Sequence, residues 1–219
     1  MNKNLKFNNN KFRIMLVGDP HEKPSDETQR DKDLISDYLA LQYAAISELK
    51  PDLVILMGDN ATGKNPEELK KVLLRITKPY AENGIPFAFV LGNHDLECEV
   101  NELNEQYNIY RQLPCCVLAD ADKVNSFGDY RLTIRSADDA SDIFNIWLMY
   151  SGSGAEPQYY SYYDFVKPGQ IEWYENEAKL LKEKNGRIIP SMVIQHIPVP
   201  EEFRLLKERS FLSMLTDGV

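Results

Sequence analysis

Short apolar runs recur along the chain, and each is followed by a stretch with a helical or turn-like pattern. The runs are rich in β-branched and aromatic residues, and unbroken apolar runs of this length are typical of strands buried on both faces. Another stretch, residues 125–136, alternates between apolar and polar positions, which predicts a strand that pairs antiparallel with residues 143–149. The apolar runs predict strands at residues 12–18, 52–58, 86–92, 144–150 and 191–195.

Helical patterns fill the segments between these runs. The first has apolar residues on a single stripe, formed by Leu34, Tyr38, Leu41, Ala45 and Leu49. The second has Asn65 as its N-cap and Pro66 at its first helical position, and Gly84 follows its end. We expect helices at residues 31–49, 66–82, 99–112 and 168–184.

The order of these elements predicts the fold class. It is βαβα, then a β-hairpin, then αβ, which is typical of a layered α/β fold whose first strands are parallel. No internal repeat or linker divides the chain, so we expect one domain over residues 12–219. The Asn-rich residues 1–11 are interpreted as a flexible tail.

Polar side chains follow four of the predicted strands directly. The chain contains only three histidines, and each comes immediately after an apolar run. Because the carboxyl ends of parallel strands line the ligand crevice of an α/β sheet, we expect these side chains to converge. The candidates are Asp19 and His21 after the first strand, Asp59 after the second, Asn93, His94 and Asp95 after the third, and His196 after the last.

Each of these pieces also has an ordinary structural interpretation. Asp19 and His21 fit a polar loop, Asp59 fits a turn that caps the next segment, and a lone His196 fits a satisfied core histidine. Turn chemistry explains Gly92 and Asn93 but gives no reason for the His and Asp that follow them. Taken together and in this order, the four pieces favour a metal site. Carboxylate, amide oxygen and imidazole suit two divalent cations about 3.5–4 Å apart, which can clamp both oxygens of a phosphoester displacement.

The order of motifs resembles that of the calcineurin-like metallophosphoesterase superfamily, whose pattern is D-x-H, G-D, G-N-H-[DE], H and G-H-x-H. Residues 13–198 contain the first four motifs. The resemblance implies a four-layer αββα sandwich of two packed sheets flanked by helices, with the last strands of the second sheet missing.

The resemblance also implies a role for each candidate residue. It places Asp19 and His21 on one metal ion, Asp59 as a bridge, Asn93 and His196 on the second metal ion, and His94, with Asp95 beside it, in catalysis. Ligand atoms that meet on shared ions should lie within about 5 Å of their neighbours.

Two further segments, residues 170–174 and 196–201, are similar to small phosphatases of the purple-acid-phosphatase-like branch. Purple acid phosphatases proper carry a tyrosine in a G-D-x-x-Y motif and usually lack the first histidine. Residues 58–62 contain no tyrosine, and His21 is present. A purple iron–tyrosinate centre is therefore not expected, and Mn, Zn or Fe could each occupy the site.

One departure from the family pattern concerns the last motif. No histidine follows His196, so G-H-x-H is absent. Residues 216–219 give no sign of a finished strand or helix. We therefore expect a chain shortened at its C-terminus, with exposed strand edges; the alternative is a degenerate, non-catalytic relative.

The charge and composition of the chain limit the partners and the location that we expect for it. The 219 residues carry a net charge of −9, which disfavours nucleic acid and anionic membranes as partners. Lys70, Lys71 and Arg75 are interpreted as a solvated helix face. The three cysteines give no disulfide framework, and no apolar run approaches the roughly 20 residues of a membrane span, so a cytoplasmic protein is expected.

These observations lead to one favoured function and two alternatives. The favoured function is a metal-dependent phosphoesterase with two divalent ions. It would hydrolyse phosphomonoesters, either phosphorylated small molecules or phosphoproteins, by in-line attack of a metal-activated hydroxide. The alternatives are a nuclease related to DNA-repair enzymes and a pseudo-phosphatase that serves as a binding platform.

Overall fold

The computed structural model describes residues 5–8, 11–24, 28–118, 124–154, 163–199 and 201. Residues 216–219, discussed above, lie outside these ranges. The strands are β1 (Ile14–Val17), β2 (Leu53–Met57), β3 (Phe87–Val90), β4 (Tyr130–Arg135), β5 (Asp142–Leu148) and β6 (Ser191–Ile194). The helices are α1 (Gln29–Leu49), α2 (Pro66–Glu82), α3 (Leu103–Arg111) and α4 (Pro168–Asn185). Each predicted element is present, and no helix in the described ranges is long and apolar enough to cross a membrane.

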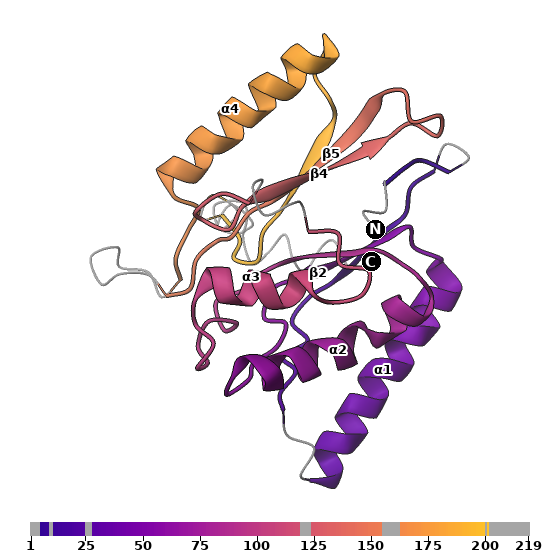
Figure 1. Ribbon diagram of the computed structural model, residues 1–219, viewed down its shortest axis with the longest axis vertical. Helices are drawn as coiled ribbons and strands as arrows, with labels where there is room; N and C mark the ends of the chain where they lie inside the picture. Colours follow the sequence, from indigo (N-terminus) through magenta and orange to yellow (C-terminus); the bar gives the residue numbers. More distant parts are fainter. Residues whose placement is uncertain are drawn as a thin grey trace, which may run out of the picture.

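The strands form two sheets that lie between helices (Figure 1). In the first sheet β1, β2 and β3 are parallel, with β2 in the centre. In the second sheet β5 pairs antiparallel with β4 and parallel with β6. Helices α1 and α2 lie on the side of the first sheet, and α4 lies outside the second. This arrangement confirms the predicted α/β fold with two sheets flanked by helices.

The main core includes buried residues of both sheets and of helices α2 and α3. The residues of β2 from Leu53 to Leu56 are fully buried, as the unbroken apolar run predicts. The Tyr130 hydroxyl of β4 reaches the first sheet, where it accepts from the Phe89 amide (3.0 Å) and donates to the Phe89 carbonyl. The Phe89 ring in turn stacks on Tyr110 of α3, with ring centroids 3.7 Å apart. These contacts fix the two sheets relative to each other.

Helix α1 packs differently from its sequence pattern. Leu34, Leu41 and Leu49, three members of the predicted apolar stripe, are 57%, 65% and 51% exposed. The buried positions are Gln42 and Ile46, and the other two members of the stripe, Tyr38 and Ala45, pack partly buried against the core. Since β1 is an edge strand of the described sheet, α1 has a neighbouring helix, α2, on one side only. The face that α1 buries is therefore rotated from the predicted stripe of leucines, toward the side on which its neighbours lie.

Part of the predicted N-terminal tail is paired with the second sheet. The Phe7 amide donates to the Arg135 carbonyl, and the Arg135 amide donates to the Leu5 carbonyl, both at 2.9 Å. Leu5 is buried. The prediction of a flexible tail over residues 1–11 therefore needs correction for residues 5–8, which extend the sheet beside the end of β4.

The buried carboxylate of Asp142 ties α4 to the second sheet. It accepts hydrogen bonds from Lys184 (2.9 Å) and Asn185 (3.0 Å), and Arg135 lies at 3.3 Å. Burial alone would raise the pKa of Asp142, but the bonds from Lys184 and Asn185, together with the positive charges of Lys184 and Arg135, lower it overall. A carboxyl whose folded-state pKa is depressed stabilises the protein above its unfolded-state pKa, and the stabilisation is lost as the pH falls.

The Asp142→Asn variant should therefore be less stable at pH 7, by about 1–3 kcal/mol, the range for a hydrogen bond to a charged group. The difference from the wild type should shrink as the pH falls below about 4, where the carboxyl of the unfolded chain becomes protonated, and it should be lost once the pH is below the depressed folded-state pKa. Urea unfolding at several pH values measures it, with the surface variant Asp33→Asn as the control. Equal stability at pH 7 would contradict a stabilising role for this group.

Candidate metal centre

The loops that follow β1 and β2 run side by side past the ends of both strands. The His21 amide donates to the Asp59 carbonyl (2.8 Å), and the Glu22 amide donates to the Asn60 carbonyl (3.1 Å). Three residues in these loops have left-handed backbones: Asp19 (φ 50°), His21 (φ 46°) and Asp59 (φ 50°). Such conformations cost on the order of 1–3 kcal/mol each, and they cluster at functional sites. The pairing between the two loops holds these residues in place.

Asp19, His21 and Asp59 are also the residues that lie close enough to share a metal ion. One possible ligand atom from each lies within 4.8 Å of the other two. The His21 Nε2 atom is 3.8 Å from Asp19 Oδ1 and 3.4 Å from Asp59 Oδ2. Asp59 is nearly inaccessible to solvent, whereas Asp19 and His21 are exposed. One buried and two accessible donors thus meet at one point.

His196 brings the second sheet to the same point. Its Nδ1 atom is 3.0 Å from the Met57 carbonyl oxygen, and its Nε2 atom is 3.1 Å from Asn93 Oδ1 and 3.3 Å from Asp59 Oδ2. Because a carbonyl oxygen only accepts, Nδ1 carries the proton in that contact, and in a neutral imidazole the Nε2 lone pair then faces two oxygens. A cation between these atoms would satisfy all three, and metal-binding histidines commonly donate their other N–H to a backbone carbonyl. The donor set therefore fits a metal ion.

All five predicted metal ligands lie together in the structure. They come from the ends of β1, β2 and β3 in one sheet and of β6 in the other, and the neighbouring atoms described above lie within 4 Å of each other. The five are Asp19, His21, Asp59, Asn93 and His196.

Two glycines permit this close approach. A Cβ atom on Gly58, whose φ is 99°, would lie 2.5 Å from the His196 ring. A Cβ atom on Gly92 would lie 2.2 Å from Asp59 Oδ1 and 2.4 Å from its backbone nitrogen. The glycines that precede Asp59 and Asn93 in the sequence motifs are thus required by space, and at Gly58 also by backbone conformation.

His94 lies beside the cluster with its side chain about half exposed. Its amide donates to Asp59 Oδ1 (2.9 Å), and its ring centroid is 5.3 Å from that of His21. Its Nδ1 atom is 2.5 Å from Glu97 Oε2. The hydrogen bond to Glu97 raises the pKa of His94, and the negative charges of Asp59, Glu97 and Asp95 act in the same direction. An ionised carboxylate only accepts, so Nδ1 is the donor and Nε2 is available to another group. The sequence analysis did not find Glu97, for which the only signal is its spacing of three residues from His94.

Asp95, for which a catalytic role is predicted, is buried among backbone amides. It is 1% exposed, and its carboxylate accepts from the amides of Asn60 (2.8 Å), Ala61 (3.0 Å) and Gly92 (2.7 Å). Burial raises its pKa to about 6 despite these bonds. The carboxylate therefore joins the loops that carry Asp59 and Asn93, and it does not face a space where a substrate could bind. These contacts indicate a positioning role for Asp95, and its catalytic role stays a prediction.

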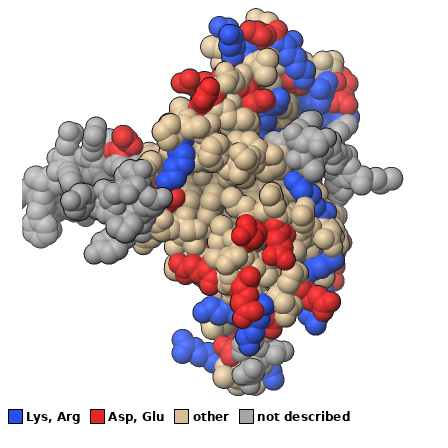
Figure 2. Space-filling view, turned by 60° about the vertical axis from the view of Figure 1, so that its left-hand side comes forward, with Lys and Arg blue, Asp and Glu red and all other residues tan. Residues whose placement is uncertain are grey.

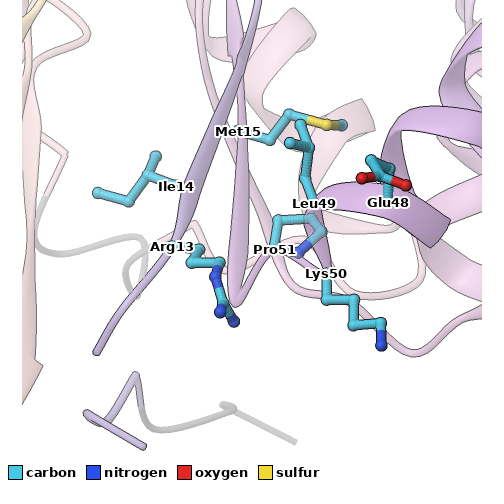
Figure 3. Close-up of a pocket in the computed structure, with 7 residues that line it drawn as sticks. All are labelled: Arg13, Ile14, Met15, Glu48, Leu49, Lys50 and Pro51. Carbon is cyan, nitrogen blue, oxygen red and sulfur yellow. The ribbon is translucent and has the colours of Figure 1, made fainter. Parts of the chain in front are cut away.

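A hollow elsewhere on the molecule is separate from this site. It has a volume of about 580 Å³ and lies between the start of β1 and the end of α1, lined by residues 13–15 and 48–51 (Figure 3). The candidate ligands follow the carboxyl ends of the parallel strands, whereas this hollow lies at the amino end of β1. It is therefore not part of the candidate metal centre.

Several known proteins are similar to this chain in sequence. Two proteins of Arabidopsis thaliana, named probable inactive purple acid phosphatase 14 and probable inactive purple acid phosphatase 29, are each 29% identical over 90% of this chain. The chain spans 56% and 57% of their lengths. A protein of Saccharomyces cerevisiae named phosphatase DCR2 is 30% identical over 69% of this chain, which spans 27% of the yeast protein.

A family model provides the broader assignment. The model for the calcineurin-like phosphoesterase family matches residues 12–215. This range includes all the candidate ligands and both sheets, and it confirms the resemblance that the motif order indicated. The chain therefore belongs to the calcineurin-like phosphoesterase family.

Proposed function

We propose that this chain is the metal-binding domain of a metal-dependent phosphoesterase that hydrolyses phosphomonoesters. The observation that carries the proposal is the placement of His196. Its Nδ1 is engaged by a backbone carbonyl, and its Nε2 faces the oxygens of Asp59 and Asn93. Three groups from three different elements thus present lone pairs to one point, which a turn or a core histidine would not require.

The donors divide between two metal positions. Asp19 and His21 would hold one ion, Asn93 and His196 would hold the other, and the Asp59 carboxylate lies between the two sets. Mixed oxygen and imidazole donors suit Mn, Zn and Fe alike. When bound, two such ions lower the pKa of bound water and neutralise charge on a phosphoryl group.

The remaining polar residues would orient the substrate and transfer protons. Half-exposed His94 can reach a phosphoryl or leaving-group oxygen through Nε2, because Glu97 engages Nδ1. Asp95 keeps the loops of Asp59 and Asn93 together. Phosphorylated small molecules and phosphoproteins both offer the monoester that this arrangement would bind.

A non-catalytic function is the second candidate. The two Arabidopsis relatives are named as probable inactive purple acid phosphatases. Their names favour a protein that binds metal or phosphate without turnover. The yeast relative is named a phosphatase, which supports the enzymatic alternative.

A nuclease is less well supported. The net charge is −9, and on the face shown in Figure 2 acidic and basic residues are interspersed without a continuous basic stripe. Nucleic-acid affinity depends on such a stripe, because it rests on neutralising backbone phosphates.

One experiment separates these functions. The purified chain, loaded in turn with Mn²⁺, Zn²⁺ and Fe²⁺, is assayed on an activated aryl phosphate, a phosphopeptide and single-stranded DNA, and its metal content is measured. Turnover of the monoesters would support the proposed enzyme, and cleavage of DNA would support a nuclease. Metal binding without turnover would support the non-catalytic function, and absence of metal binding would refute the metal centre.

The His94→Ala variant tests the role of the exposed histidine. It should retain its metal, because His94 is not among the proposed ligands, and lose about 10²–10⁴-fold in turnover, the usual range for a positioned acid or base. Elemental analysis and turnover of the aryl phosphate measure the two effects. If His94 only supported the loop through its exposed contact with Glu97, the variant would lose at most about 1 kcal/mol of stability, with unchanged turnover.

A further inference from the structure

Arg75 of α2 contacts the loop that carries two of the candidate ligands. Its Nη2 atom donates to Glu22 Oε2 (2.8 Å) and to the Lys23 carbonyl oxygen (2.7 Å). The Glu22 side chain is only 10% exposed and that of Arg75 25% exposed. Arg75 is therefore not part of a solvated helix face, as the sequence pattern suggested, but half of a largely buried ion pair.

This ion pair lies next to the segment that carries the candidate ligands Asp19 and His21. Glu22 directly follows His21, and the segment from Asp19 to Glu22 contains two left-handed residues that are not glycine. Backbone bonds hold one side of the segment: the Asp19 amide donates to the Gly58 carbonyl (3.3 Å), and the Glu22 carbonyl accepts from the Thr62 amide (3.0 Å). Arg75 holds the end of the segment from a different element, helix α2.

We propose that Arg75 and Glu22 are positioning residues for the metal position formed by Asp19 and His21. The inference rests on the metal centre proposed above. Without Arg75 the largely buried Glu22 carboxylate would lose its charged partner, which is strongly unfavourable, so the side chain would turn toward water. Because Glu22 adjoins His21, that movement would shift the His21 ring away from Asp59. Among the described residues no hydrogen bond or ion pair joins Asn93 or His196 to the Arg75–Glu22 pair, so the position that they form should keep its geometry.

The Arg75→Gln variant should therefore weaken one metal position selectively. We expect the Kd for Mn²⁺ at the Asp19–His21 position to rise about 10–100-fold, the usual cost of losing a group that orients a ligand. Calorimetric titration with Mn²⁺ should resolve a weakened step and an unchanged step. Electron paramagnetic resonance at two equivalents of Mn²⁺ should show the signal of a coupled pair in the wild type and that of a single ion in the variant.

Three variants serve as controls. Lys78→Gln removes a cation from the same helix, where Lys78 lies 3.8 Å from Glu82 on the exposed surface, and both steps should be unchanged. Arg75→Lys keeps the charge and should restore part of the affinity. Glu22→Gln keeps the side-chain shape and removes the charge. It should weaken the same step less than Arg75→Gln does, and it replaces that variant if Arg75→Gln does not fold.

The outcomes separate this inference from the metal centre itself. A lower melting temperature in EDTA with both Mn²⁺ steps unchanged would show a merely structural ion pair and overturn the inference. Equal weakening of both steps would also overturn it. If the wild type bound no Mn²⁺, or if Asp59→Ala left its binding unchanged, the proposed metal centre would fall first, and this inference with it.

Discussion

Replacing Asp59 by alanine is expected to abolish binding of the metal pair, with the Kd for Mn²⁺ raised more than about 100-fold, the upper end of the cost of losing a supporting group. Asp59 Oδ2 is 3.4 Å from His21 and 3.3 Å from His196, so one carboxylate serves both proposed positions. Its negative charge would offset that of both cations, which no other described side chain is placed to do. Titration calorimetry and elemental analysis measure the loss.

The control for this variant is Asp33→Ala, which removes the same charge from the exposed surface of α1. It should bind metal as the wild type does. Asp59→Asn keeps one amide oxygen and should retain weak binding at a single position. If Asp59→Ala bound two ions with wild-type affinity, the carboxylate would not belong to the metal centre.

Replacing Asp95 by alanine is expected to lower the free energy of unfolding by about 2–4 kcal/mol, because buried amides without a partner cost roughly 1–3 kcal/mol each and partial relaxation recovers some of the loss. The amides left without the carboxylate are those of Asn60, Ala61 and Gly92. Urea unfolding in EDTA measures this effect in the absence of metal.

The same variant distinguishes positioning from catalysis. Asp95→Asn keeps an acceptor oxygen and should lose less stability than Asp95→Ala. Metal affinity should fall in both variants, because the loops of Asp59 and Asn93 are no longer joined. A variant with wild-type stability and metal content but no turnover would instead support the catalytic role that the motif first indicated.

Much of the fold could be predicted from local patterns. The apolar runs of β2 and β3 are buried on both faces, so their sequence reads as continuous strands. Asn65 and Pro66 begin α2 as expected, and the Asn65 side chain accepts from the Glu68 amide (2.9 Å). Helix starts of this kind are encoded within one turn, so no distant contact is needed to recognise them.

The convergence of the site could also be predicted, for a topological reason. Asp19, Asp59 and Asn93 follow consecutive parallel strands of one sheet, and the carboxyl ends of such strands share an edge. Spacing alone therefore indicated that these side chains meet. His196 follows a strand of the other sheet, so the shared edge does not explain its presence, and its signal was its place directly after an apolar run.

Only the tertiary structure decided the roles of residues that share a local environment. His94 and Asp95 are neighbours in sequence, but one is half exposed and the other is enclosed by backbone amides. Which face α1 buries and which acid Arg75 meets depend on elements far away in the chain. The sequence by itself determined the strands, the helices and the edge where the polar side chains gather. Contacts between elements decided which of those side chains are free to act and which hold the others in place, because burial and partners arise only when the layers pack.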